Sequence, residues 1–427
     1  MTTQIAKTAQ KTRAEEVYAD LDNLPDGYGD IRQSAHSAIV ENGLPHRRIE
    51  EWKWTDLRRI VDQAYPPAIG GEISTATYDA LSAHSPFADI AASRLVFING
   101  RFDAQRSKLP ENISVKMLSD APEVDFSLRD GDAVDALNLA YASDGALINI
   151  AKGDSQDPIE LLFITAPEQA STITTRNVIE LEEGAIATVF ETHTGSDQAY
   201  VTNAVTEIKI GKGASMHRVR LQEDGPSAIH LSNTTANLAT DSKLQDFTFT
   251  LGGATVRNQG FVTFDGENAS ANVSGSYMLA GKQHVDTTLL VNHAVPSCQS
   301  RELFKCVMDE NSRGIFQGKV IVARDAQKTD GQQSANALLL SEGAEFDAKP
   351  ELEIYADDVW CGHGATSGDL DENQLFYLKT RGIPEKQAKA LLIAAFAAAA
   401  FEEIENEAVR DAFNEIAQSW LARHKGA

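Results

Sequence analysis

The sequence predicts a mainly β protein in which a parallel β-helix is flanked by a helical domain at each end. From Arg94 onward, short β-branched and alternating runs separated by Gly, Asn and Asp continue for roughly 250 residues, and helical periodicity almost vanishes there. Within this stretch, small-residue corners recur at intervals of 27 to 29 residues, at Gly184-Ala185, Gly213-Ala214, Asp241-Ser242 and Asn268-Ala269. A similar corner stands at Gly343-Ala344.

A recurrence of this length, with two strands in each unit, favours a solenoid over a doubly wound sheet with interposed helices. A β-sandwich with comparable turn spacing is the alternative. Because an open rung of a solenoid exposes unpaired backbone donors and acceptors, we expect the flanking helical units to cover its ends.

The pattern predicts three domains: an N-terminal helical domain at 1–90, the β-helix core at 91–370 and a C-terminal helical domain at 371–427. "RAEEVYADLDNL" and "IRQSAHSAIVENGL" carry the helical period near the N-terminus. Near the C-terminus, Gly382 suits the end of one helix and Pro384 the first turn of the next. The alanine-rich helix that follows suits either a buried position or a face for docking a partner.

Composition excludes several classes of partner. Lys and Arg number 38 against 62 Asp and Glu, so the net charge of -24 repels nucleic-acid phosphates. The first residues lack the apolar stretch of a secretory signal, and the apolar run Leu391–Phe401 is too short to span a membrane. Three cysteines, an odd number in a long chain, favour a reducing compartment. We therefore expect a cytoplasmic protein that contacts neither nucleic acid nor membrane.

Familiar catalytic motifs are missing. "GSYMLAGKQ" places five residues between Gly275 and Gly281 where a phosphate-binding loop needs four, so ATP is not expected to bind this chain. No G-x-S-x-G supports a serine hydrolase. His284 and Asp286 would share a strand face, but for His284 or His293 a structural hydrogen bond is the simpler interpretation.

The stretch "DDVWCGHGATSGDL" contains the strongest site candidate. In an extended strand, Cys361 and His363 would point to the same side, with Cα atoms about 7 Å apart, as a pair of soft-metal ligands. Zinc sites and iron-sulfur clusters usually take four ligands, and no C-x-x-C supplies the remainder. The pair therefore fits a site shared between chains or a cluster that is held only transiently.

The chain resembles the SufD subunits of the SUF iron-sulfur cluster assembly machinery. The resemblance rests on "RRIEEWKWTDL", on "SRELFK", and on the long stretch from Arg313 to Ile383 that contains "AQKTDGQQSAN", "DDVWCGHGA" and "LFYLKTRGI". This chain carries "CGHGA" where the paralogous SufB subunits have a Glu-containing E-H-E-A stretch. Gly362, Trp54 and Cys306 depart from the usual Ser, Tyr and Gly, and we expect Cys306 to be a small buried residue.

This resemblance implies a right-handed β-helix between helical domains, pairing with a SufB-like paralogue through the β-helices, and docking of one SufC-like ATPase on the C-terminal region. It assigns a transient iron-sulfur cluster or iron, shared with the partner subunit, to His363 first and to Cys361 second. The ATPase contact falls in "LFYLKTRG", at Leu375, Phe376, Tyr377, Leu378, Arg381 and Gly382.

On this interpretation the protein is a non-enzymatic scaffold. Three points stay open: whether it also aids iron acquisition, whether the isolated chain forms a homodimer, and whether the complex carries reduced flavin. The main alternative is a β-helix carbohydrate-active enzyme, but no carboxylate pair suited to glycoside chemistry can be identified. A second alternative is a Cys-His hydrolase that uses Cys361.

Overall fold

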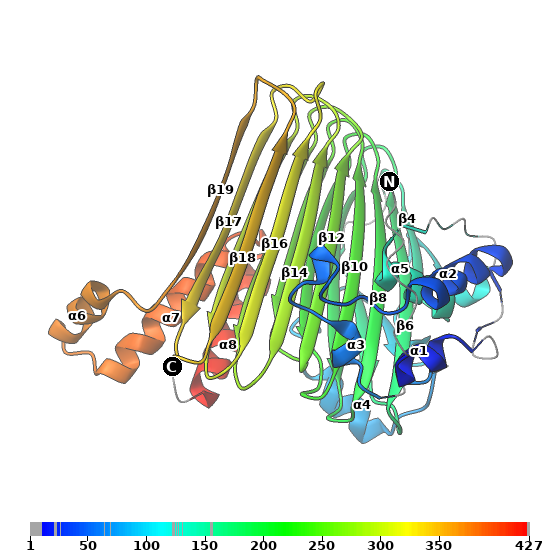
Figure 1. Ribbon diagram of the computed structural model, residues 1–427, viewed down its shortest axis with the longest axis horizontal. Coiled ribbons are helices and arrows are strands. Elements are labelled where there is room, and N and C mark those ends of the chain that lie inside the picture. The colour runs from blue at the N-terminus through cyan, green and yellow to red at the C-terminus, as the bar shows by residue number, and fades with distance from the viewer. Residues whose placement is uncertain are drawn as a thin grey trace.

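The computed structural model describes residues 11–20, 24–25, 27–63, 65–68, 70–121, 124, 126, 128–129, 131–153 and 157–424. Over these residues the chain winds into a parallel β-solenoid of about eight turns, with helices on its flanks (Figure 1). Each turn contributes one strand to each of two sheets, and in-register parallel pairing joins a strand to its counterpart one turn later. The predicted β-helix is confirmed, and the β-sandwich alternative is wrong.

The described strands form two sheets, whose members follow in spatial order. The first sheet has nine strands: β3 (Ser114–Met117), β4 (Ala146–Ile150), β6 (Ser171–Leu181), β8 (Tyr200–Ile210), β10 (Ile229–Leu238), β12 (Thr255–Phe264), β14 (His284–His293), β16 (Arg313–Val322) and β18 (Glu345–Ile354). The second has ten: β2 (Arg101–Phe102), β1 (Ser93–Ile98), β5 (Ile159–Thr165), β7 (Ile186–Gly195), β9 (Ser215–Glu223), β11 (Lys243–Thr250), β13 (Ser270–Leu279), β15 (Gln299–Met308), β17 (Asp330–Leu339) and β19 (Trp360–Gly368).

The predicted corners lie along one edge of the solenoid, where the chain passes from the nine-stranded to the ten-stranded sheet. Gly184, Gly213, Asp241 and Asn268 have φ of 72°, 64°, 59° and 60°, the left-handed conformation that Gly, Asn and Asp tolerate best. Each corner residue is followed by a small buried one, and the Gly184 N–H donates to the carbonyl of Lys212 in the next turn at 2.9 Å. These hydrogen bonds set the period that is visible in the sequence.

The corner at Gly343-Ala344 is different. It joins β17 to β18 and therefore lies on the opposite edge of the solenoid. Its inclusion in the predicted series is wrong, because both edges use small residues in tight turns and local sequence does not distinguish them.

One end of the solenoid is closed by strands. β2 and β3, the terminal strands of the two sheets, are short and pair antiparallel with β1 and β4. Phe102, Val115 and Met117 pack there against the main apolar core. We call this the closed end.

Helices near the N-terminus pack on the outer faces of the solenoid, mostly over its early turns. They are α1 (Arg13–Tyr18), α2 (Gly29–Asn42), η2 (Glu50–Trp52), α3 (Leu57–Ile60), α4 (Thr75–Ser82), η3 (Leu118–Asp120) and α5 (Ala133–Tyr141). The segment around Glu51 reaches later turns, where its carbonyl accepts hydrogen bonds from Arg257 of β12 and Gln317 of β16. The helix α5 lies within the stretch expected to lack helices. Its residues from Val134 to Tyr141 are all buried, and it packs against β6, β8 and β10. The Asp132 side chain caps it by accepting hydrogen bonds from two backbone N–H groups.

The C-terminal helices are α6 (Glu372–Thr380), α7 (Glu385–Phe401) and α8 (Glu407–Arg423). α7 and α8 pack on the outer face of the ten-stranded sheet, where Ile393, Phe401 and Phe413 join Phe249 and Val307 in one apolar cluster. One face of the alanine-rich helix is thus buried against the sheet, whereas Leu391 on the same helix is 47% exposed, so the docking alternative stays a prediction. The expectation that helices cover both ends of the solenoid is wrong, because these two lie along its side. The predicted domain boundaries at residues 90 and 370 stay predictions.

Candidate functional site

The last turn of the solenoid carries the predicted ligand pair. β19 is the edge strand of the ten-stranded sheet and pairs with β17, which places Gly331 beside Cys361 and Gln333 beside His363. β18 is the edge strand of the other sheet. We call this turn, with its two edge strands, the open end.

Cys361 and His363 face the interior of the solenoid at this end. The Cys361 side chain packs against the main apolar core, and its Sγ lies 3.6 Å from the point where a Cβ on Gly331 would stand. Because side chains alternate along a strand, His363 lies on the same face. His363 is exposed, since no further turn covers it. The predicted same-face arrangement is confirmed, whereas the ligand roles stay predictions.

The Cys361 thiol is not poised as a thiolate. Partial burial raises its pKa above the usual range, the nearby Asp330 and Glu302 carboxyls raise it further, and the Gly331 backbone amide offsets only part of this. A metal binds the thiolate, so ligation by Cys361 requires loss of its proton. His363 therefore remains the more accessible donor.

Two buried polar side chains continue the row of His363 into the solenoid. Gln333 on β17 pairs with Glu302 on β15, and both face inward with exposed fractions of 3% and 2%. Burial raises the pKa of Glu302 to about 8 because it penalises the charged form; Ser300 and Arg301 counteract this weakly. Sequence reasoning missed both residues. The sequence shows a polar residue at an inward-facing position in each of "SRELFK" and "DGQQSAN". That these positions face inward can be recognised only once the strand register is known.

The other histidines of interest have structural contacts. His284 faces outward, and its Nε2 lies 3.0 Å from Oγ1 of Thr55, whose hydroxyl also donates to Asp286 at 2.5 Å. His293 is buried, with Nε2 3.1 Å from the Ser300 hydroxyl, and burial lowers its pKa to about 4. Both satisfy the simpler interpretation, although Nδ1 of His293 has no hydrogen-bond partner.

The other two cysteines are interior packing residues. Cys306 is fully buried in the core, and burial raises the pKa of its thiol far above the usual range. Cys298 is likewise buried, at the position that Ala269 occupies one turn earlier. In the part of the chain that the structure describes, no group of three or more His, Cys, Asp or Glu side chains could hold a metal ion.

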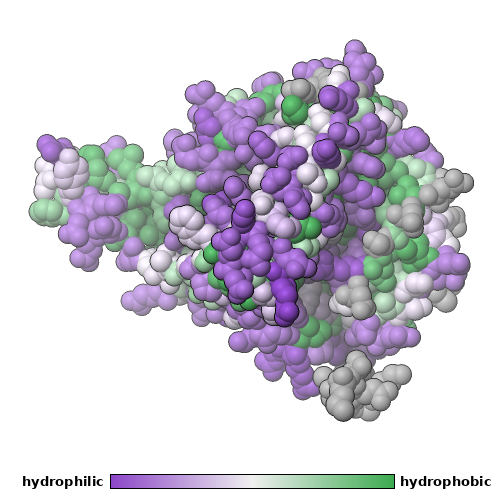
Figure 2. Space-filling model, turned by 90° about the horizontal axis from the view of Figure 1, so that it is seen from above, coloured by the Kyte–Doolittle hydropathy of each residue, from purple (hydrophilic) through white to green (hydrophobic). Residues whose placement is uncertain are grey.

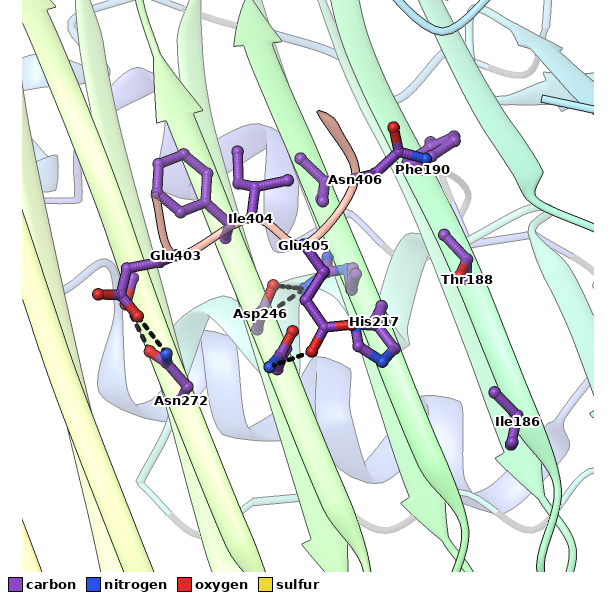
Figure 3. A pocket seen from close by; sticks show the side chains of 15 residues that line it. Ile186, Thr188, Phe190, His217, Asp246, Asn272, Glu403, Ile404, Glu405 and Asn406 are labelled. Carbon is purple, nitrogen blue, oxygen red and sulfur yellow. Dashed lines mark hydrogen bonds and ion pairs between the residues drawn. The ribbon is translucent and has the colours of Figure 1, made fainter. Parts of the chain in front are cut away.

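The connection between α7 and α8 is tied to the outer face of the ten-stranded sheet. The Asn272 amide donates to Glu403 at 2.5 Å, and Glu405 accepts from Gln245 at 2.9 Å and lies 3.5 Å from His217 (Figure 3). A cavity of about 290 Å³ lies beneath this connection. These contacts fix α7 and α8 in place.

α6 projects away from this fixed pair and carries most of the residues predicted to contact an ATPase. It buries no side chain in this chain, and Phe376 and Tyr377 are 69% and 57% exposed. The Arg381 guanidinium lies over the Tyr377 ring at 5.1 Å, and Gly382 ends the helix with φ of 84°. Figure 2 shows the region of α6 as a protrusion with apolar surface. Leu375 and Leu378 are half-buried.

Comparison with known proteins decides the family. The model of the SUF system FeS cluster assembly SufBD core domain matches residues 163–396, and that of the SufBD protein N-terminal region matches 23–160. The chain belongs to the SufBD family. Iron-sulfur cluster assembly protein SufD of Escherichia coli is 34% identical over 87% of this chain and 88% of its own length.

Other SufBD relatives agree over similar spans. A SufBD family protein of Synechocystis is 32% identical over 87% of this chain and 86% of its own length. Protein ABCI7, chloroplastic, of Arabidopsis thaliana is 27% identical over 89% and 83%. This membership assigns the chain to an assembly family and removes the basis for the carbohydrate-active alternative. None of the helices described is long and apolar enough to cross a membrane.

Proposed function

We propose that this SufBD chain is the non-ATPase scaffold subunit of a cytoplasmic SUF complex, without turnover of its own. It pairs with a SufB-like paralogue at the open end and lends His363, with Cys361 second, to a transient cluster or iron. The observation that carries the proposal is the position of a thiol and an imidazole, two side-chain types that can ligate iron, on an edge turn beside exposed Trp360. Two donors leave coordination positions for a neighbour.

The edge strands support pairing with another β-helix. β18 and β19 present unpaired backbone groups, and such edges add strands from a partner. Ile354, Tyr355 and Trp360 are 40%, 62% and 77% exposed around this edge and supply apolar contact. A SufB-like paralogue is the occupant we propose, and a second copy of this chain is the alternative that its size in isolation will reveal.

α6 supports docking of the SufC-like ATPase, which binds the nucleotide for the complex. Its exposed Phe376 and Tyr377 have no packing role within this chain. On this proposal, closure of the ATPase pair pulls on α6 and α7 and shifts the open-end interface, so that the ligands meet incoming iron and sulfide. A neutral imidazole holds iron less firmly than a thiolate and is lost on protonation, which suits a cluster that must leave.

The test is His363→Ala in the co-expressed complex, with iron and sulfide measured anaerobically after purification. We expect cluster content to fall about tenfold while all subunits still co-purify. Ser367→Ala, on the same strand and face, is the matched control and should change nothing. Normal cluster content in His363→Ala rejects the ligand role.

Docking is tested separately by Phe376→Ala with Tyr377→Ala. This pair is cleaner than deletion from Asp371 onward, because α7 and α8 also cover apolar residues of the sheet. We expect loss of the ATPase from the purified complex and retention of the paralogue. Undiminished co-purification of the ATPase contradicts the assignment.

A further inference from the structure

Buried polar atoms without partners gather just inside the open end. Both carboxyl oxygens of Glu302 and both the oxygen and nitrogen of the Gln333 amide are buried and lack a hydrogen bond of acceptable geometry. Leaving a buried donor or acceptor unpaired is destabilising. Four such atoms on two adjacent side chains therefore indicate that something polar occupies the space between them.

Strand register places these two side chains on neighbouring strands, facing the interior. Val273, Glu302, Gln333 and His363 occupy one inward-facing row across β13, β15, β17 and β19, with neighbouring strands about 4.8 Å apart. Gln333 extends across the interior, since a Cβ added to Gly318 of the opposite sheet would lie 2.1 Å from its Nε2. Glu302 thus lies one strand behind an amide that spans the lumen, and two strands behind the exposed His363.

The donors at this place suit a divalent cation. Glu302 offers carboxylate oxygens and Gln333 an amide oxygen, with the Ser300 hydroxyl two residues from Glu302 on the same face. Oxygen donors of this kind bind Mn²⁺ and Fe²⁺. Within the described residues no Lys, Arg or His forms an ion pair with Glu302, whereas the interior Arg218 is paired with Glu191 at 2.6 Å and Asp246 at 3.2 Å. A bound cation would supply the missing positive charge.

We propose that Glu302 and Gln333 form an interior binding site for a divalent first-row cation of the Fe²⁺ type, separate from the pair at the open end. Glu302 exchanges its proton for the cation, Gln333 turns its amide oxygen toward it, and water completes the coordination. Access is through the open end, past His363. The site is a property of this chain alone, so it does not depend on the proposed cluster ligands.

Metal binding to the isolated chain tests this site. Mn²⁺ is followed by electron paramagnetic resonance, and Fe²⁺ by anaerobic equilibrium dialysis. We expect one ion of each to bind the unaltered chain and Glu302→Gln to weaken binding at least about tenfold. Glu302→Val provides a second variant, because Val273 already occupies this row one turn earlier.

Variants of the two open-end residues, His363 and Cys361, distinguish the interior site from the site proposed to be shared with a partner subunit. His363→Ala and Cys361→Ser should bind Mn²⁺ as the unaltered chain does, even where His363→Ala lowers cluster assembly. Equal binding by the unaltered chain and Glu302→Gln would place the ion elsewhere, and no binding by either would mean that water alone fills the interior; both outcomes would overturn the proposal. Loss of Mn²⁺ binding in His363→Ala would assign the ion to the pair His363 and Cys361 at the open end, and this outcome would also overturn the proposal.

Discussion

The two ends of the solenoid solve the same problem in opposite ways. At the closed end, two short antiparallel strands terminate the sheets, and Phe102, Val115 and Met117 pack into the core. At the open end, β18 and β19 extend for ten and nine residues and pair in parallel with β16 and β17, and no further strand among the described residues covers their outer edges. Short strands blunt an edge, whereas long unpaired ones invite a partner. The architecture of the open end is therefore suited to pairing, and that of the closed end is not.

Charge at the open end should produce the largest difference between the two ends. Tyr355→Asp combined with Trp360→Asp places two carboxylates among exposed apolar side chains, and we expect the affinity for the paralogue to fall more than about 100-fold. Affinity is measured by biolayer interferometry with the purified partner. Leu109→Asp is the matched control, an apolar residue 48% exposed between β2 and β3. An equal loss for Leu109→Asp would remove the distinction between the ends.

Truncation of core residues should separate the ends in stability. Met117 is 7% exposed at the closed end, so Met117→Ala should lower the free energy of unfolding by about 2–4 kcal/mol. Leu352 on β18 is only half-buried, and Leu352→Ala should cost less than half as much in the isolated chain. Urea denaturation measures both. A larger loss of unfolding free energy for Leu352→Ala than for Met117→Ala would contradict the interpretation that the open end is less completely packed than the closed end.

Glu302 should make stability depend on pH. Its pKa rises from 4.5 to about 8 on folding, so the unfolded chain loses this proton first and stability falls between pH 4.5 and 8. Glu302→Gln removes this loss. We expect the variant to gain about 4 kcal/mol relative to the unaltered chain when pH is raised from 4.5 to 8.5. Melting curves in metal-free buffer measure it, and a pH-independent difference would place Glu302 in a more polar environment.

The smallest effect on stability is expected for substitution of His363 at the open end. His363 is exposed, so His363→Ala should change the free energy of unfolding by less than about 0.5 kcal/mol. Thermal unfolding of the isolated chain measures it. A marked loss of stability would mean that the effect of this variant on cluster content reflects folding rather than ligation.

Local sequence was sufficient to predict the repeat and the position of Cys361 and His363 on one strand face. Left-handed corners favour Gly, Asn and Asp, and these residues recur where the chain turns. The spacing of Cys361 and His363 places both on one face of any strand. Local sequence could not place Gly343 on the right edge or find α5 among the strands. Glu302, Gln333 and His363 are 30 or 31 residues apart, so only long-range register brings them into one row.

The unfinished last turn also has a consequence for supply in the cell. On the proposed pairing with a SufB-like paralogue, any surplus of this chain leaves bare strand edges at the open end, and such edges recruit other chains into aggregates. The proposal therefore predicts matched synthesis of the two subunits or rapid proteolysis of the excess.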